Sequence, residues 1–248
     1  MSTPFRPRNV PEILDASFQV LRGHYLPILT ATGVLLLPTA LLGIAAPELA
    51  WAGNLLRLVL ANFASAATVL IVADLYLGRD VDGLRAVREA FSHGWRLIGA
   101  SILAGLITIV GFVLCIVPGF LAMLLLFAAS IAVVVEGKGP IAALERSVDL
   151  ANDNMLRILL TSVMAQVIVT VAGEGLKVLA LFAEPVLGPR AAALADVFTI
   201  LLSPFPAVVS TVLYFDIRVR KEGFGMDDLS DLVQAMSAEQ PRAGVPGA

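Results

Sequence analysis

Four ionisable residues lie inside long apolar segments, where a charge requires a partner or a role. Arg57 falls in one such segment, Glu174 and Lys177 lie three residues apart in another, and Asp196 falls near the start of a third. Ionisable side chains in hydrocarbon are costly and often mark a binding site or an ion path. One interpretation is an outward-facing polar cavity in which Arg57 and Lys177 receive an anionic headgroup. The other is structural pairing, Arg57 with Asp196 and Lys177 with Glu174, with long side chains extending to the interface.

The remaining reactive side chains form no recognisable site. Cys115 is the single cysteine and lies in an apolar run, and His24 and His93 each stand just before an aromatic residue at a membrane entry. Two histidines and one cysteine are too few for a usual zinc site built from these ligands. We therefore predict no catalytic residue, no cofactor and no metal site, and the chain is not expected to be an enzyme.

The composition indicates that lipid surrounds most of the chain. Of the 248 residues 58% are hydrophobic and 15% are charged, against about 45–50% and about 25% in a typical soluble domain. A net charge of −3 gives no indication of a nucleic-acid partner. Runs of roughly 18 or more apolar residues predict membrane-spanning helices. The predicted spans are 25–46, 51–77, 95–117, 118–135, 155–183 and 190–215.

Helices are the expected conformation, because backbone groups in hydrocarbon must be satisfied internally and no alternating strand pattern is present. We predict an outer turn at Pro118-Gly119. We also predict a kink or break in the last span at Ser203-Pro204, because proline lacks the helical N–H donor.

The basic residues predict the orientation. All of the 17 lysines and arginines fall on one side of the predicted spans except Arg57, Lys177 and Arg190. Positive charge collects in cytoplasmic loops. Both termini are therefore expected in the cytoplasm, with residues 222–248 forming an acidic tail after a membrane domain of residues 1–221.

The sequence contains a weak threefold repeat. Each odd-numbered span is preceded by an amphipathic segment, and Leu14, Leu84 and Leu144 occupy matching positions in the three segments. Such helices commonly lie in the headgroup plane; the alternative is a connector packed under the spans. The even-numbered spans also end alike, since Asp74 precedes Arg79, Glu136 precedes Lys138 and Asp216 precedes Arg218. We expect each acid to be satisfied by a neighbouring cation or by lipid headgroups.

Two stretches resemble a known family. They are VPGFLAMLLLFAASIAVVVEGKGPIAALERSVDLANDNMLRIL (residues 117–160) and LYFDIRVRKEGF (residues 213–224). Together they are similar to the integral-membrane domain attached to some bacterial glycerophosphoryl diester phosphodiesterases, and to its stand-alone relatives. The resemblance implies a helical membrane domain in the bacterial inner membrane. It implies no catalysis, because phosphodiesterase chemistry in that family belongs to a separate soluble barrel.

These observations predict an all-α, six-span membrane bundle of three hairpins, each preceded by an amphipathic interfacial helix. The favoured function is a non-enzymatic scaffold or lipid-associated membrane domain. Its expected partners are membrane lipids and an envelope protein. The alternative is a small transporter or lipid-handling protein that uses the cavity suggested by Arg57, Glu174, Lys177 and Asp196.

Overall fold

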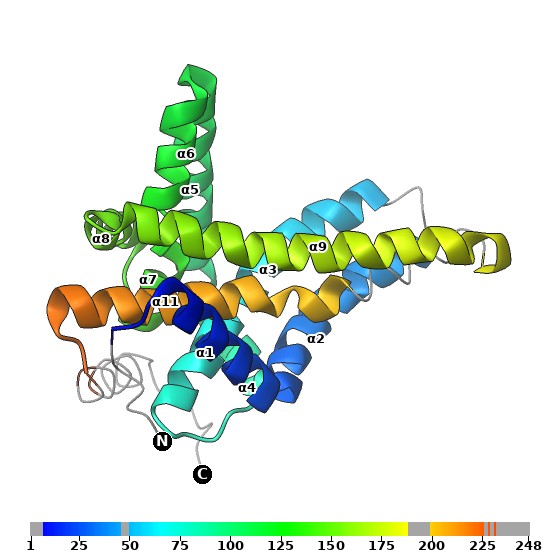
Figure 1. Ribbon diagram of the computed structural model, residues 1–248, viewed down its shortest axis with the longest axis horizontal. Helices are drawn as coiled ribbons and strands as arrows, with labels where there is room; N and C mark the ends of the chain where they lie inside the picture. The colour runs from blue at the N-terminus through cyan, green and yellow to red at the C-terminus, as the bar shows by residue number, and fades with distance from the viewer. Residues whose placement is uncertain (1–6, 46–49, 188–198, 226–227, 229–230, 232–248) are drawn as a thin grey trace, which may run out of the picture.

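The computed structural model describes residues 7–45, 50–187, 199–225, 228 and 231, and this part of the chain is helical with no strand. Figure 1 shows the arrangement of the helices. Their bounds are α1 (Val10–Gly23), α2 (Tyr25–Ala45), α3 (Ala50–Tyr76), α4 (Gly83–Ser92), α5 (Gly94–Leu114), α6 (Ile116–Leu125), α7 (Ala129–Glu136), α8 (Pro140–Ala151), α9 (Met155–Leu187) and α11 (Pro204–Glu222).

Six helical segments of the described chain are long and apolar enough to cross a membrane. They correspond to α2, α3, α5, α6 with α7, α9, and α11 with the four helical residues before its break. The predicted all-α, six-span fold is confirmed, and the chain is a multi-pass membrane protein. The predicted first residues of the first and fifth spans, Tyr25 and Met155, are also the first residues of α2 and α9.

The short helix at the start of each repeat packs on the hairpin of the preceding repeat, and that of the first repeat packs on the third. The first repeat is α1 to α3, the second is α4 to α7, and the third is α8 to α11. Helix α4 packs on α2 and α3 of the first repeat, α8 packs on α5, α6 and α7 of the second, and α1 packs on α9 and α11 of the third. Each short helix therefore stabilises a hairpin that is not its own.

One face of each short helix is buried by this packing, and another remains apolar and exposed. Ile13 and Ala143 are fully buried at equivalent positions of α1 and α8, while Phe18, Leu84 and Ile141 are exposed. Such helices combine the two sequence interpretations. They pack under the spans, and they still present apolar side chains in the manner of a helix at headgroup depth.

Helix α4 approaches α2 closely because its first residue is a glycine. A Cβ atom built on Gly83 would lie 2.1 Å from the Thr30 hydroxyl oxygen and 2.3 Å from the Pro27 carbonyl oxygen. Asp82 precedes it, and its carboxylate accepts a hydrogen bond from the backbone N–H of Leu84. This N-cap interaction satisfies one of the free donors at the start of the helix.

The core lies where the even-numbered spans approach one another. Helix α3 packs against both α7 and α11. The buried stretches are 66–73 on α3, 131–135 on α7 and 211–218 on α11. Helix α11 is enclosed on all sides over this stretch and includes the fully buried Tyr214 and Phe215. The packed interior is therefore concentrated in one half of the molecule.

The α5–α6 hairpin projects away from this core in a direction of its own (Figure 1). Its turn lies at Cys115, which is extended at φ −172° and ψ 160°. The predicted turn at Pro118-Gly119 was wrong, because Pro118 is the third residue of α6. The first four N–H groups of a helix have no intrahelical acceptor, so proline loses nothing there.

The fourth predicted span, 118–135, is not one continuous helix. It is interrupted at residues 126–128, between α6 and α7. Ser147 of α8 enters this break, donating to the Leu125 carbonyl at 2.7 Å and accepting from the Ala128 N–H at 3.0 Å. The sequence did not indicate this break, because it depends on a hydroxyl about twenty residues further along the chain.

The sixth span is broken where its prolines predicted. Ser203 separates helical residues 199–202 from α11, and Pro204 is the first residue of α11. Proline is well placed at a helix start because its missing N–H has no intrahelical acceptor there. Helix α11 continues to Glu222, seven residues beyond the predicted end at Phe215. These extra turns carry all of its charged side chains.

Candidate functional site

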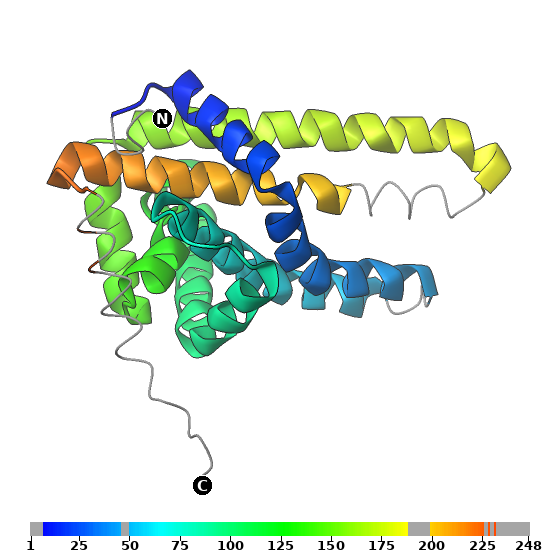
Figure 2. The same cartoon turned by 90° about the horizontal axis from the view of Figure 1, so that it is seen from below.

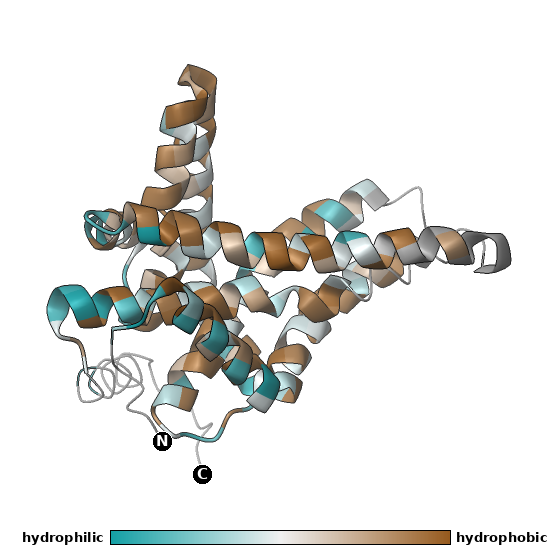
Figure 3. Cartoon of the chain, in the orientation of Figure 1, coloured by the Kyte–Doolittle hydropathy of each residue, from teal (hydrophilic) through white to brown (hydrophobic). Residues whose placement is uncertain are grey.

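Charged residues gather at one end of the molecule, where the last turns of α11 meet α7, α8, the start of α9 and the segment before α1. Figure 3 shows polar segments at this end and apolar ones along α5 and α6. We call it the charged end. Its central side chains come from residues 136–146 and 214–222, which lie within the two stretches that carry the sequence resemblance. The fold thus joins segments about 70 residues apart.

The Glu136 carboxylate is the centre of an ionic network. Helix α7 ends at Glu136, and the left-handed Gly137 (φ 63°) turns the chain away. The carboxylate accepts hydrogen bonds from the Tyr214 hydroxyl at 2.5 Å and from the Arg146 Nε at 2.9 Å. A second guanidinium, that of Arg218, lies 3.6 Å away. With 7% of its side chain exposed, Glu136 joins α7, α8 and α11.

Glu222 completes this network from the end of α11. Its carboxylate lies 2.5 Å from Arg146 and 2.9 Å from Arg218, so it bridges the same two guanidinium groups as Glu136. Burial opposes the charge of Arg146, but hydrogen bonds to Glu222 and Glu136 outweigh burial and raise its pKa. Buried charges are tolerated when they are paired in this way. The five residues Glu136, Arg146, Tyr214, Arg218 and Glu222 are the ionic network.

Aromatic rings enclose Arg218. Its guanidinium carbon lies 3.6 Å from the centre of the Phe224 ring and 5.7 Å from that of Tyr214. Phe224 reaches this position because Gly223 adopts a left-handed conformation (φ 66°) and ends α11. Phe224 then stacks on Phe215. Cation–π contacts of a desolvated arginine add to its ion pairs, so the helix end is fixed by packing as well as by charge.

A second cluster surrounds the fully buried carboxylate of Asp216. It accepts from the Arg220 Nε at 2.9 Å, from Arg157 at 3.3 Å and from the backbone N–H of Arg8 at 2.5 Å. Arg157 and Arg220 also both donate to the Arg8 carbonyl. These four residues are the Asp216 cluster. It ties the segment before α1 to α9 and α11.

The two clusters lie on different faces of α11. Tyr214, Arg218 and Glu222 are spaced by four residues and face α7 and α8, whereas Asp216 and Arg220 face α1 and α9. Residues four apart share a helix face. The last two turns of α11 therefore act as a two-sided ionic clamp between repeats.

The equivalent acid of the first repeat is less well paired. Asp74 lies 3.7 Å from Arg79, and Glu136 lies 3.6 Å from Lys138, so of the two expected partners a neighbouring cation is found for both acids. On the adjacent α4, burial raises the pKa of Glu89, and the charge of Asp74 adds to the effect. Asp216 is also satisfied by cations, Arg157 and Arg220, but not by Arg218. Arg218 lies on the other face of α11, two residues away and thus about 200° around the helix.

The four intramembrane residues singled out by the sequence are only partly described. Arg57 is half-buried on α3 and Glu174 is exposed on α9. The side chain of Lys177 and all of Asp196 lie outside the described residues. The polar cavity and the structural pairing therefore both stay predictions. Within the described residues, no group of three or more His, Cys, Asp or Glu side chains is placed to hold a metal ion.

Sequence reasoning found the acids at the ends of the even-numbered spans but missed most of their partners. Arg157 sits at the start of α9 and Arg8 before α1, and neither position carries a local signal of pairing with Asp216. The four-residue spacing of Tyr214, Arg218 and Glu222 was the one available signal for a shared face. Its target, Glu136, could be identified only with the fold in hand.

Comparison with known proteins places this architecture in a family. Residues 13–216 match the family described as "Domain of unknown function (DUF7847)". No curated protein and no solved structure matches the chain. The matched region runs from α1 to Asp216 of α11 and so contains all three repeats, together with Glu136, Arg146 and Tyr214. On this match over most of its length, the chain belongs to the DUF7847 family.

Proposed function

We propose that this protein is a non-catalytic, lipid-associated scaffold of the bacterial inner membrane, with both termini in the cytoplasm. The observation that supports the proposal is that its buried carboxylates are paired with groups of the protein itself. In the ionic network and the Asp216 cluster, each carboxylate is bound by cations or hydroxyls of other helices. Groups that could otherwise bind a substrate serve instead to join the three repeats.

The proposed orientation rests on charge. Arg8, Arg146, Arg157 and Arg220 all contribute to the charged end, and basic residues favour the cytoplasmic side. The turn at Cys115 lies at the far tip of the α5–α6 hairpin (Figure 1). Charged end and hairpin tip are therefore expected on opposite sides of the membrane.

The single cysteine gives a direct test of this orientation. A membrane-impermeant maleimide is expected to label the exposed Cys115 once the outer membrane is opened and while the inner membrane is intact. A matched variant carries Cys115→Ser and Asp82→Cys, and it is expected to react only after the inner membrane is permeabilised. The reverse labelling pattern would contradict the proposed topology.

The resemblance to membrane domains of phosphodiesterases suggests an envelope enzyme as the partner of the scaffold. Benzoylphenylalanine placed at the exposed Arg88 of α4 is expected to form one dominant protein adduct in cells. The matched position Val113 is 81% exposed at the hairpin tip and is expected to capture lipid.

An assay for lipid hydrolysis is the strictest test of the non-catalytic role. Purified protein in nanodiscs is expected to leave phospholipids and glycerophosphodiesters intact. Turnover of either substrate that is lost in Tyr214→Phe would contradict a non-catalytic role, because that hydroxyl would then do more than bind Glu136.

A further inference from the structure

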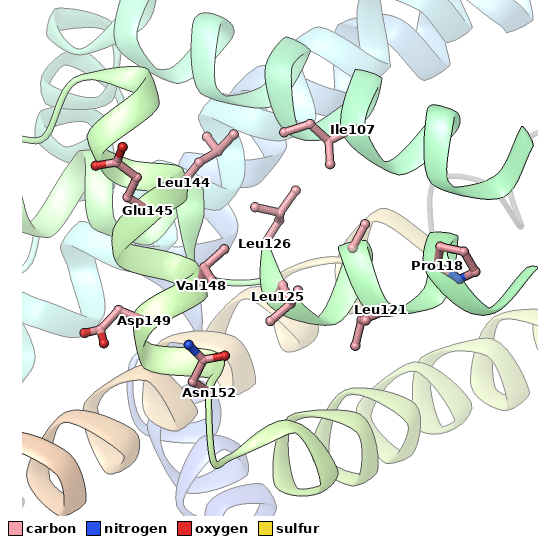
Figure 4. A pocket seen from close by; sticks show the side chains of 11 residues that line it. Ile107, Pro118, Leu121, Leu125, Leu126, Leu144, Glu145, Val148, Asp149 and Asn152 are labelled. Carbon is pink, nitrogen blue, oxygen red and sulfur yellow. The ribbon is translucent and has the colours of Figure 1, made fainter. Parts of the chain in front are cut away.

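A groove opens between the α5–α6 hairpin and α8 (Figure 4). Its volume is about 550 Å³, within the roughly 300–1,000 Å³ of sites that hold small molecules. The floor and walls are apolar and include Leu121 and Leu125 of α6 and Val148 of α8. The groove follows α6 from Leu125 to Pro118, seven steps or about 10 Å at the helical rise.

Polar groups occur at one end of the groove and come from α8 and the residue that follows it. Glu145, Asp149 and Asn152 form this rim. Glu145 and Asp149 lie four residues apart on one face of α8, and Asn152 directly follows the last residue of α8. Asp149 is paired with Lys221 at 3.0 Å. Among the described residues, no hydrogen bond or ion pair engages the side chains of Glu145 and Asn152, which are both exposed.

We propose that this groove binds one phospholipid with a primary-amine headgroup, such as phosphatidylethanolamine. The hairpin is a membrane-spanning element, so the groove opens toward hydrocarbon and an acyl chain can enter it from the side. The groove is apolar along its length and polar at one end, and a phospholipid has the same arrangement of acyl chain and headgroup. The proposal deepens the lipid association of the proposed scaffold and names the lipid.

Charge complementarity selects the headgroup. The free carboxylate of Glu145 binds the ammonium group, and the amide N–H groups of Asn152 donate to the phosphate. The pair Asp149–Lys221 supplies a second acid and a cation at the same rim. A headgroup that is anionic and lacks an amine, such as phosphatidylglycerol, would place its net negative charge against Glu145.

Native mass spectrometry of the full chain, extracted from nanodiscs of equal phosphatidylethanolamine and phosphatidylglycerol, tests the proposal. We expect one retained phosphatidylethanolamine, enriched about tenfold over phosphatidylglycerol. Ala122→Trp fills the groove and is expected to reduce retention at least tenfold, whereas Val113→Trp on the exposed tip should leave it unchanged. Glu145→Lys is expected to abolish the enrichment, and Asp15→Lys on α1 provides the same charge change elsewhere.

Two results would overturn the proposal. One is retained lipid of bulk composition that Ala122→Trp does not alter, which would mean annular lipid alone. The other is enrichment of phosphatidylglycerol. Either result in a folded protein leaves the scaffold function untouched, because partner capture at Arg88 is measured separately.

Discussion

The charged end and the α5–α6 hairpin differ in what surrounds them. At the charged end, Glu136 and Asp216 are almost completely enclosed by protein. On the hairpin, large apolar side chains such as Ile109, Val113 and Val117 are exposed, and the α5 span is 17% buried. In lipid such exposure costs little, because the surrounding tails are as apolar as the side chains. Contacts between protein groups therefore hold the repeats together at the charged end and in the adjoining core of α3, α7 and α11.

The largest effect is expected from Glu136→Ala. The substitution removes the acceptor shared by Tyr214 and Arg146 and leaves buried guanidinium charge without compensation, which costs about 3–5 kcal/mol in comparable cases. Equilibrium unfolding in bicelles measures the change in free energy. Glu145→Ala removes the same charge from an exposed site on the adjacent helix and is expected to cost less than about 0.5 kcal/mol. Equal losses of unfolding free energy in the two variants would show that the buried network stabilises the protein no more than an exposed charge does.

A smaller loss is expected from Asp216→Asn. The amide keeps one acceptor oxygen but loses the charge that balances Arg157 and Arg220, so about 1.5–3 kcal/mol should be lost. Asp149→Asn is the matched control, because Asp149 is also paired but is 56% exposed. Exposed pairs contribute about 0–1 kcal/mol. A control loss as large as that of Asp216→Asn would show that burial does not set the strength of these pairs.

The sequence predicted the elements better than their arrangement. Apolar run length located the spans, and Ser203-Pro204 located the break in the last one, because both signals are local. The break at residues 126–128 has no proline or glycine and depends on Ser147. The turn at Cys115 was missed because Pro118-Gly119 carries a stronger turn signal and yet fits within a first helical turn.

Gly83 on α4 and Gly105 on α5 allow packing to be compared between a tightly packed helix contact and the α5–α6 hairpin. Gly83→Ala would force a methyl group against Thr30 and Pro27, and overpacking of this kind costs about 1–3 kcal/mol. Gly105→Ala on α5 meets no atom within 4 Å and should stabilise by up to about 1 kcal/mol, the difference in helix propensity. Thermal unfolding of both variants measures the contrast. Destabilisation by Gly105→Ala would contradict the description of the hairpin as loosely packed.

A modest loss is expected from Ser147→Ala. It removes the hydroxyl that satisfies the Ala128 N–H and the Leu125 carbonyl, and an unsatisfied buried group costs about 1–3 kcal/mol. Water reaching the break would lower this cost to near 1 kcal/mol. Hydrogen exchange at Ala128 should increase in the variant, while exchange within α9 stays unchanged. Unchanged exchange at Ala128 would mean that the break does not need Ser147.

A double-mutant cycle between Glu136 and Arg146 tests most directly whether the ionic network joins the repeats. Unfolding free energies are measured for Glu136→Gln, Arg146→Gln and the double variant, with Asp149→Gln and Lys221→Gln as the exposed comparison. We predict a coupling energy of about 1.5–3 kcal/mol for the buried pair and below about 1 kcal/mol for the exposed one. A buried coupling no larger than the exposed one would contradict the network as an element that holds the second and third repeats together.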